Sequence, residues 1–272
     1  MTTWFEAVAS LRAARRPGVL VTVTDVRGHA PRDAGAKMVV ADDATWGSIG
    51  GGNLEEEAVR RSRDLVAGAA VKPESFTANL SDKAPFQHGV QCCGGDVTVL
   101  LDPLPVVPSV AIFGVGHVGL ELARILARHD LDLHLVDSRG DRLSDDTLAP
   151  LADAVATVHT HLVPVIPELV LAELPAGTDV LVMTHDHAED LAILDAALRC
   201  EHLGRIGLIG STAKWTRFRA KLTAAGFDDT QLDRVDTPIG LPGVTTSKEP
   251  AAIAVSVAAD WLASFERSLT RR

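Results

Sequence analysis

The sequence lacks the features of secreted, membrane-spanning and nucleic-acid-binding proteins. Its 272 residues include only three cysteines, which cannot form a disulfide framework, so we expect a reducing compartment, the cytoplasm. No apolar run approaches the ~20 residues of a membrane span. Residues 1–16 mix apolar and charged side chains, as an amphipathic helix does and a signal peptide does not. The net charge of −10 argues against general binding of nucleic acid or anionic membranes. Tyrosine is absent, for which we have no physical account.

What the chain does contain indicates a globular protein with more than one domain. Hydrophobic residues make up 46% and charged residues 23%, which is enough apolar content for a real core. Pro103, Pro105 and Pro108 fall close together, and proline cannot continue a helix or a central strand. We therefore predict a linker at 103–109 between an N-terminal domain, 1–102, and a C-terminal domain, 110–272.

The two parts differ in their patterns. In the first, apolar runs at 19–24, 37–40 and 97–101 predict strands and 54–67 predicts a helix, so we expect a small α+β unit. In the second, short apolar strands alternate with helices of 10–15 residues, which predicts βαβ units and a parallel sheet. The fold class is therefore α/β, with a Rossmann-like C-terminal domain and a smaller α+β N-terminal domain.

The run at 114–119 fits the pattern G-x-G-x-x-G, follows a predicted strand and opens a predicted helix. Gly114 would make the tight turn, Gly116 would let the backbone approach a phosphate, and Gly119 would pack the helix on the sheet. Asp137 ends the next predicted strand, near the ~20-residue spacing of a ribose-binding carboxylate. The alternative is a Rossmann-like domain that keeps the turn but binds something other than NAD.

A second glycine run, at 47–52, precedes another predicted helix. Asn53 as N-cap and Glu56 three residues later suggest a capping box, and acids in the first turn would repel a phosphate. The loop is either a tight turn before the helix or a place where the backbone at Gly50 and Gly51 approaches a cofactor.

Residues 184–190 bring two histidines and three acids to the end of a predicted strand. The spacing of His185 and His187 is not specific for a metal, and Thr184 or Asp186 as helix cap explains much of the pattern. In a parallel sheet this loop lies where ligands bind, so His185 and Asp186 are candidates for lining a site.

A third strand–glycine–helix turn occupies 207–214, with Ser211 as a cap. Lys214, Arg217 and Lys221 follow at i, i+3 and i+7 on the predicted helix. They form either a solvated basic face or a contact for an anion or an acidic partner.

The adjacent Cys92 and Cys93 stand before Gly94 and Gly95. Neighbouring side chains on a strand point to opposite faces, so such a pair suits core packing poorly, and the glycines allow close approach of a ligand. A thiolate there is a nucleophile or a soft-metal ligand. The alternative is a poorly reactive turn pair. Cys200 is interpreted as a small hydrophobic residue.

Six motifs occur in an order that resembles the XdhC/CoxI family of molybdoenzyme accessory proteins. The resemblance runs from about Phe5 to Trp261, and six ordered motifs are far more specific than any one. The motifs are residues 47–52 with the acidic helix after them, 91–95, 114–119, 184–187, 209–214 and 238–241. One departure is the segment 243–250, a loose version of the family's helix entry.

The resemblance implies a chaperone that binds the molybdenum cofactor (molybdopterin), protects it and promotes exchange of an oxo for a sulfido ligand with a cysteine desulfurase. It implies that the chaperone delivers the cofactor to xanthine dehydrogenase or a related molybdoenzyme and contacts proteins of molybdenum cofactor biosynthesis. It also implies that the protein is not itself a turnover enzyme. Family members commonly carry a cysteine before the Gly-Gly pair, here Cys93, and Cys92 is the extra one of the xanthine dehydrogenase branch. A homodimer is a further expectation.

These arguments together predict a cofactor held in a cleft between the two domains, with its phosphate on the 114–119 turn and Cys93 toward the metal. The candidate metal ligands are Cys92 and Cys93. The candidate cofactor-binding residues are Cys92, Cys93, Gly94, Gly95, Gly50, Gly51, Gly114, Gly116, His117, Gly119, Asp137, His185, Ser211 and Lys214.

Two other functions compete with this prediction. An NAD(P)-dependent oxidoreductase would use the glycine fingerprint and Asp137, but the sequence shows no convincing hydride-transfer constellation, so NAD(P) is not the expected cofactor. A thiol-redox or metal-sensing module would use the cysteines, which lack the C-x-x-C spacing of a redox pair.

Overall fold

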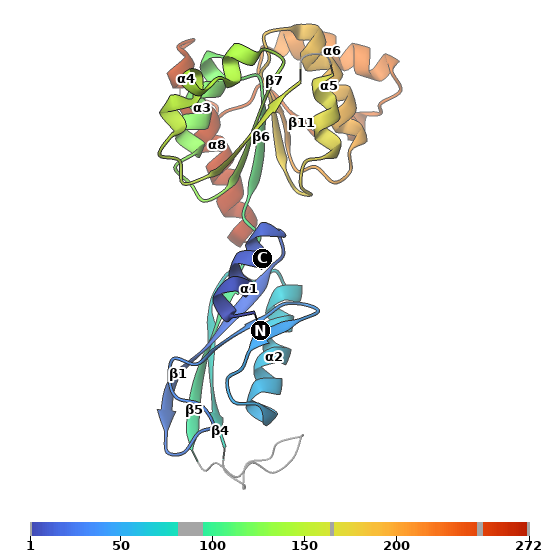
Figure 1. The fold of residues 1–272 in the computed structure, drawn as a ribbon. Helices are drawn as coiled ribbons and strands as arrows, with labels where there is room; N and C mark the ends of the chain where they lie inside the picture. Colours follow the sequence, from blue (N-terminus) through green and yellow to red (C-terminus); the bar gives the residue numbers. More distant parts are fainter. Residues whose placement is uncertain (1, 81–94, 164–165, 244–246, 271–272) are drawn as a thin grey trace. The chain divides into compact units, whose positions relative to one another are not determined.

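The computed structural model describes residues 2–80, 95–163, 166–243 and 247–270, which fold into two compact units, Met1–Val106 and Val107–Arg267 (Figure 1). The elements of the first unit are α1 (Trp4–Ala13), β1 (Gly18–Arg27), β2 (Lys37–Val40), β3 (Thr45–Gly47), α2 (Gly52–Ala67), β4 (Glu74–Asn79) and β5 (Asp96–Leu104). Those of the second are β6 (Ser109–Phe113), α3 (His117–Leu126), β7 (Asp132–Asp137), η1 (Gly140–Leu143), α4 (Asp145–Leu148), η2 (Ala149–Leu151), β8 (Thr157–Leu162), η3 (Pro167–Ala172), β9 (Asp179–Val182), α5 (His187–Arg199), β10 (Ile206–Leu208), α6 (Thr212–Ala224), α7 (Asp229–Leu232), β11 (Val235–Asp236) and α8 (Pro250–Thr270).

The first unit is an antiparallel sheet with a helix on each face. Its strand order is β3-β2-β1-β5-β4. Alternate residues of β1 and β5 pack with Leu54 and Ala58 of α2, while Leu11 of α1 packs with Val39 on the other face. This is the two-residue period of a strand covered on both sides.

Strand β5 continues further than the prolines led us to expect. Pro103 lies inside it, in register with Val19 of β1. The other neighbour, β4, stops pairing at Leu101. Pro103 therefore sits where β5 has become an edge strand, and a residue without an N–H is tolerated there. The predicted linker at 103–109 was wrong in this respect, because strand residues occupy its first and last positions.

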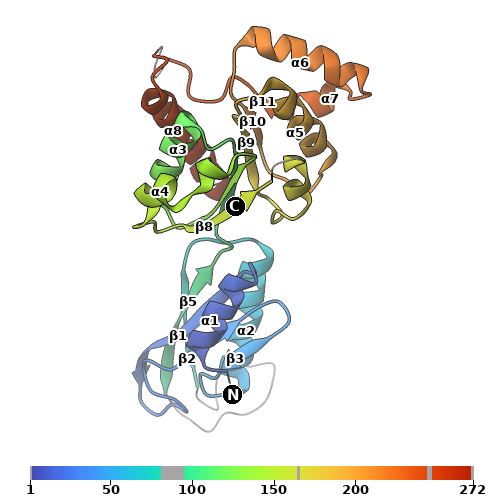
Figure 2. The same cartoon turned by 45° about the horizontal axis from the view of Figure 1, so that its top comes forward.

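The second unit is a parallel six-stranded sheet of order β11-β10-β9-β6-β7-β8. Numbered along the chain from β6, this is the order 3-2-1-4-5-6 of dinucleotide-binding domains, with the strand order reversing between β6 and β9. The predicted α/β class and Rossmann-like domain are confirmed. In Figure 2, α3 and α8 lie on one face of the sheet and α5 and α6 on the other.

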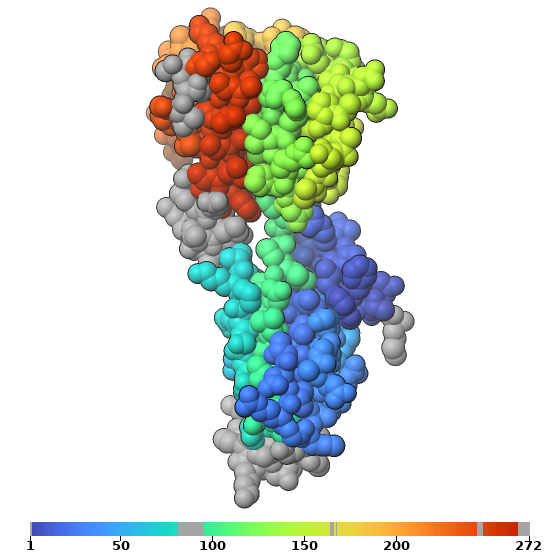
Figure 3. Space-filling model, turned by 90° about the vertical axis from the view of Figure 1, so that its left-hand side faces the viewer, coloured from blue at the N-terminus to red at the C-terminus, as the bar shows by residue number. Residues whose placement is uncertain are grey.

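Two apolar layers cover the sheet. Helices α3 and α8 pack side by side on one face, as Figure 3 also shows, through residues such as Leu122 and Trp261. Helices α5 and α6 cover the other face through residues such as Ile193 and Phe218. All five residues of β6 are buried, as expected for a central strand covered on both faces.

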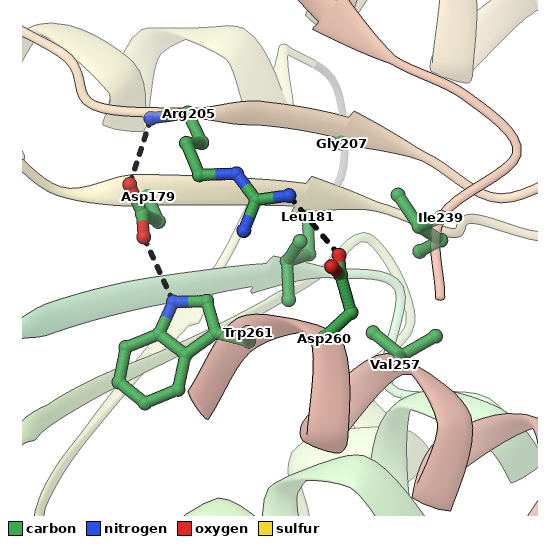
Figure 4. Close-up of a pocket in the computed structure, with 8 residues that line it drawn as sticks. All are labelled: Asp179, Leu181, Arg205, Gly207, Ile239, Val257, Asp260 and Trp261. Atoms are coloured by element: carbon green, nitrogen blue, oxygen red, sulfur yellow. Dashed lines mark hydrogen bonds and ion pairs between the residues drawn. The ribbon is translucent and has the colours of Figure 1, made fainter. Parts of the chain in front are cut away.

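A polar network fastens α8 to the edge of the sheet where the parallel strands begin (Figure 4). The Asp179 carboxylate accepts hydrogen bonds from the backbone N of Arg205 at 2.7 Å and from Nε1 of Trp261 at 2.8 Å. The Arg205 guanidinium pairs in turn with Asp260 at 3.0 Å. These residues border a cavity of about 10 Å³, room for about one water molecule. Burial raises the pKa of Asp179, against the effect of its two donors.

Substitution of Trp261 by phenylalanine is expected to destabilise the protein more at neutral than at acid pH. The raised pKa of Asp179 means that folding stability already falls as pH rises through that pKa, since the folded state holds the proton longer than the unfolded state. Loss of the indole donor removes support from the ionised carboxylate, with an expected loss of about 1–3 kcal/mol at pH 7 and less near pH 4. Urea unfolding across that pH range tests this, and a loss that does not vary with pH would contradict it.

Candidate functional site

Four turns meet at the carboxyl edge of the parallel sheet in the second unit. They follow β10, β9, β6 and β7, which are consecutive neighbours in the sheet. In open parallel sheets this edge, at the point where the strand order reverses, is where ligands bind. The edge therefore gathers all the site residues that the sequence predicted for this unit.

The glycines of the 114–119 turn divide into two that the fold requires and one that it does not. Gly114 has φ +102°, and a Cβ there would lie 2.4 Å from the Met183 carbonyl oxygen. A Cβ at Gly119 would lie 2.1 Å from the carbonyl oxygen of Gly114. Gly116 has an ordinary φ of −78°, and a Cβ there would meet nothing within 4 Å.

Gly116 is also the N-cap of α3, and no side chain caps that helix end. The first N–H groups of a helix have no partner within the helix, and they favour an anion. His117, the first residue of the helix, is exposed. The turn therefore offers an open space that a Cβ would fill, beside backbone donors suited to a phosphate.

Asp137, at the end of β7, is almost completely buried, and its carboxylate is already hydrogen-bonded within the chain. Its carboxylate forms a two-pronged ion pair with Arg139, with distances of 2.9 Å, and accepts the backbone N–H of Val115 at 2.7 Å. Burial alone would raise the pKa of Asp137, but these donors outweigh it and hold the pKa below its usual value. The acid thus binds the glycine turn of its own chain.

Glu189 joins this site, and the sequence interpretation gave it no role. His185 is exposed and its Nδ1 lies 3.7 Å from Oε2 of Glu189, while the hydroxyl of Ser138 lies 3.5 Å from the same oxygen. Burial raises the pKa of Glu189, and the charge of Asp137 adds to that effect. Ser138 follows β7, and Glu189 lies in the first turn of α5, which follows β9, so the two side chains meet from beyond the two strands that flank β6.

Asp186 caps α5, as the sequence suggested. Its carboxylate accepts the backbone N–H groups of Ala188 at 2.5 Å and Glu189 at 3.1 Å. These donors lower the pKa of Asp186. Ser211 caps α6 in the same way by accepting the N–H of Lys214 at 3.3 Å. Both residues therefore have a structural task in positioning the turns of the site.

Lys214 is buried in an ion pair with Asp190. Its Nζ lies 2.5 Å from Oδ2 of Asp190 and 2.9 Å from the carbonyl oxygen of Ile209. The other Asp190 oxygen accepts the N–H of Thr184 at 3.0 Å and its hydroxyl at 2.8 Å. The pair ties the turn after β9 to the turn after β10. The predicted alternative of a solvated basic face was therefore wrong for Lys214. The ion pair with Asp190 accounts for a lysine at this position without a bound anion.

In the first unit, the glycine loop binds a carboxylate of its own helix. Oε2 of Glu55 accepts the N–H groups of Ile49 and Gly51, both at 3.0 Å, and the hydroxyl of Ser48 at 2.6 Å. Helix α2 begins at Gly52 with Gly51 as N-cap. The predicted cap at Asn53 and capping box with Glu56 were wrong, because Glu55 reaches back to the loop instead.

Two glycines of the first unit, Gly50 and Gly95, pack against one turn, at 28–32. A Cβ at Gly50 would lie 2.5 Å from Cγ of Pro31, and one at Gly95 would lie 2.5 Å from the carbonyl oxygen of His29. Gly51 has open space at the corresponding position. Gly95 is therefore a position of close backbone packing, and the loop at 47–52 lies near the point where β5 begins.

Cys92, Cys93 and Gly94 lie outside the described residues. The described chain stops at Leu80 and resumes at Gly95, and the N–H of Leu80 donates to the carbonyl oxygen of Gly95 at 2.8 Å. The two described residues that flank this segment, Leu80 and Gly95, are therefore hydrogen-bonded to each other at the end of the sheet where Arg27 pairs with Asp96.

An apolar cavity of about 230 Å³ lies in the first unit at the opposite end of that sheet. It is lined by residues from the start of β1, the end of α2 and the end of β5, among them Gly18, Leu65 and Leu104. Gly18 pairs with Leu104, and Arg27 with Asp96 at the far end of the same strands. At ~3.4 Å per residue the cavity is roughly 30 Å from the cysteine segment's anchor points, so it is separate from them.

Three histidines that the sequence interpretation passed over form a cluster on β7 and β8. Nδ1 of His134 lies 3.0 Å from Nε2 of His161, and the rings of His134 and His159 stack with their centres 4.6 Å apart. Burial, followed by the charge of His159, lowers the pKa of His161. The alternation of His159 and His161 along one strand face was the available clue.

Neither a metal centre nor a membrane span is found in the part of the chain that the structure describes. Across residues 2–80, 95–163, 166–243 and 247–270, no three histidine, cysteine or acidic side chains converge to hold a metal ion. Within the same ranges, no helix has both the length and the apolar character needed to cross a bilayer.

Comparison with known proteins finds relatives of low sequence identity that match most of this chain. YqeB of Escherichia coli (strain K12), an uncharacterized protein, is 25% identical over 258 residues, which are 95% of this chain and 45% of YqeB. The chain thus spans about half the length of that relative. The molybdenum cofactor insertion chaperone PaoD of the same organism is 24% identical over 267 residues, 89% of this chain and 81% of PaoD. A solved structure described as a xanthine dehydrogenase from Bacillus halodurans covers 98% of this chain and 96% of its own, with 19% identity and a TM-score of 0.47.

Two family matches agree with the strand order and the glycine turn described above. Residues 110–261 match the XdhC Rossmann domain, and residues 11–74 match the XdhC and CoxI family. The first match covers more than half of the chain and coincides with the parallel sheet of the second unit. The chain therefore belongs to the XdhC and CoxI family.

Proposed function

We propose that this protein is an accessory chaperone that binds the molybdenum cofactor and inserts it into a molybdoenzyme. The observation that carries the proposal is the open turn at Gly116, in a chain whose relative PaoD is named a molybdenum cofactor insertion chaperone. The phosphate of molybdopterin is an anion that the uncapped end of α3 would favour. A chaperone also needs no hydride-transfer or hydrolytic constellation.

The residues at the turn fit a phosphate group. Gly116 adopts a backbone conformation that any residue can adopt, so the fold does not explain why it is glycine. The absence of a side chain there leaves room for a ligand to approach the backbone. By contrast, the N–H groups of Ile49 and Gly51 in the loop at 47–52 already donate to the carboxylate of Glu55. We therefore assign the phosphate to the second unit.

Cys93 and Cys92 are the proposed thiol contacts of the cofactor. When bound, the cofactor would supply a molybdenum centre held by dithiolene sulfurs, and thiolates suit such soft centres. We further propose that the protein supports sulfuration of the cofactor together with a cysteine desulfurase and that its client is xanthine dehydrogenase or a related hydroxylase. Proteins of cofactor biosynthesis would supply the ligand. The cytoplasm is the proposed compartment, because adjacent free thiols persist in a reducing medium.

Substitution of Cys93 by alanine is expected to weaken cofactor binding at least tenfold, because a metal-coordinating thiolate contributes more than the ~1.4 kcal/mol that a tenfold change represents. Cys200→Ala is the matched control: this thiol is half-buried at the end of α5, far along the chain from the proposed contact. Titration of the purified protein and both variants with isolated molybdenum cofactor measures the effect. Equal affinity in all three proteins would exclude Cys93 as a contact. Cys92→Ala in the same titration shows which thiol acts.

A further inference from the structure

Every acceptor position of the Asp137 carboxylate is used from within the chain. Oδ1 accepts the backbone N–H and Nε–H of Arg139, both at 2.9 Å. Oδ2 accepts Nη2–H of Arg139 at 2.9 Å and the backbone N–H of Val115 at 2.7 Å. A carboxylate has about four lone-pair sites. In dinucleotide-binding domains the acid at the end of this strand accepts the hydroxyl groups of the adenosine ribose, and here none of its sites is left for them.

The arginine also shields the acid. The Asp137 side chain is 2% exposed, and that of Arg139 is 27% exposed. A ribose would therefore have to displace the guanidinium before it reached the carboxylate. Removing one partner of a buried ion pair is strongly unfavourable, because the other charge is left without compensation.

The charges around the pair make that displacement harder. Arg139 also faces the carboxylates of Glu189 and Asp141. Without the guanidinium, Asp137 and Glu189 would remain as neighbouring acids, and their mutual repulsion already contributes to the raised pKa of Glu189. The site thus holds Arg139 in place from several directions.

We propose that the Asp137–Arg139 ion pair is a specificity-determining element that closes the glycine turn of the second unit to the ribose diol of NADH. The fold keeps the glycine fingerprint of a dinucleotide site, while Arg139 binds the carboxylate that would otherwise accept the ribose hydroxyl groups. Arg139 acts here as a positioning residue, through Asp137. The inference concerns the same turn as the proposed cofactor site, but its readout is nucleotide binding, so either proposal can fail without the other.

An arginine beside this acid can also receive the 2′-phosphate of NADPH. The geometry favours exclusion instead, because two of the three guanidinium nitrogens that could donate to such a phosphate, Nε and Nη2, already bind Asp137. NADPH is therefore a separate arm of the test.

The experiment is a titration of the full chain and its variants with NADH, followed by energy transfer from tryptophan to the nicotinamide. The wild-type protein is expected to show no saturable binding up to millimolar NADH. Arg139→Ala frees the carboxylate and is expected to bind NADH at least tenfold more tightly, the factor for one or two charge-assisted hydrogen bonds. The same variant is expected to prefer AMP over 2′-deoxy-AMP, because the gained contact is to the ribose hydroxyls. Arg124→Ala, which removes an exposed arginine of α3 paired with Glu121, is the matched control and is expected to change nothing.

Three results would overturn the proposal. The first is saturable NADH binding by the wild-type protein, and the second is tight NADPH binding that Arg139→Ala abolishes. The third is an Arg139→Ala protein that keeps its near-ultraviolet circular dichroism yet gains no affinity for NADH or AMP. If that variant does not fold, Arg139→Gln, which removes the charge but keeps part of the side chain, takes its place and is held to the same gain.

Discussion

Replacement of Lys214 by methionine is expected to lower the free energy of unfolding by about 3–5 kcal/mol. The substitution removes the only cation in the contacts described for Asp190, whose side chain is 0% exposed. Methionine keeps most of the length and apolar volume of the lysine stem, so the loss reports the charge and its hydrogen bonds rather than a cavity. The carbonyl oxygen of Ile209 loses a donor as well. Differential scanning calorimetry and urea unfolding measure the effect.

The matched control is Lys221→Met, on the same helix but exposed. It is expected to change stability by less than about 0.5 kcal/mol. The double variant Asp190→Asn with Lys214→Met removes both charges and keeps an oxygen for the two Thr184 donors, so it is expected to recover part of the loss. Equal effects of the two lysine substitutions, or no recovery in the double variant, would show that the pair is not what holds the two turns together.

Lys214 also illustrates what a single sequence can and cannot specify. The i, i+3, i+7 pattern placed Lys214, Arg217 and Lys221 on one helix, and α6 contains all three. Only the last two are exposed. The partner of Lys214 is Asp190, in the first turn of α5, the helix that follows a different strand, and only the adjacency of β9 and β10 brings the two helix ends together. Helical periodicity describes the faces of one helix, so it cannot predict an ion-pair partner that lies in another crossover helix.

The fold itself could be predicted to a similar depth. Alternation of apolar strands and helices indicated a parallel sheet, because each crossover needs a helix. The Rossmann class followed from the glycine turn between a strand and a helix. The order of the six strands depends on contacts distant in sequence, and β11 is only two residues long, so no local pattern predicted it. The extension of β5 through Pro103 depends on where β4 stops, which is again a tertiary property.

The candidate site shows the same division. Its turns were predicted because glycine, cap residues and strand ends are local features. Asp137 was singled out correctly as the acid that ends β7, but its hydrogen bonds to Arg139 and Val115 were not predicted. The contact with Val115 joins residues 22 positions apart in the sequence. The sequence did not predict a role for Glu189, because its raised pKa depends on burial and on the nearby Asp137, and neither Asp137 nor Ser138 is near it in sequence.

A pair of alanine substitutions in the 114–119 turn is expected to separate folding from ligand binding. Gly119→Ala should destabilise the second unit by about 3 kcal/mol, toward the upper end for overpacking, because its Cβ would lie 2.1 Å from the backbone oxygen of Gly114. That oxygen belongs to a turn that is itself packed against Met183, so it has little room to move. Calorimetry of the variant and of the wild-type protein measures the loss.

Gly116→Ala makes the same chemical change three residues earlier and is expected to cost at most about 1 kcal/mol, the scale of a changed N-cap. Its Cβ meets no protein atom within 4 Å and its backbone needs no glycine, so the added methyl group enters only the space above the turn. If a phosphate occupies that space, affinity for the molybdenum cofactor should fall at least tenfold while the melting temperature stays close to that of the wild-type protein. A Gly116→Ala protein that binds the cofactor unchanged would place the phosphate elsewhere. A large loss of stability in this variant would instead mean that the turn serves the fold alone.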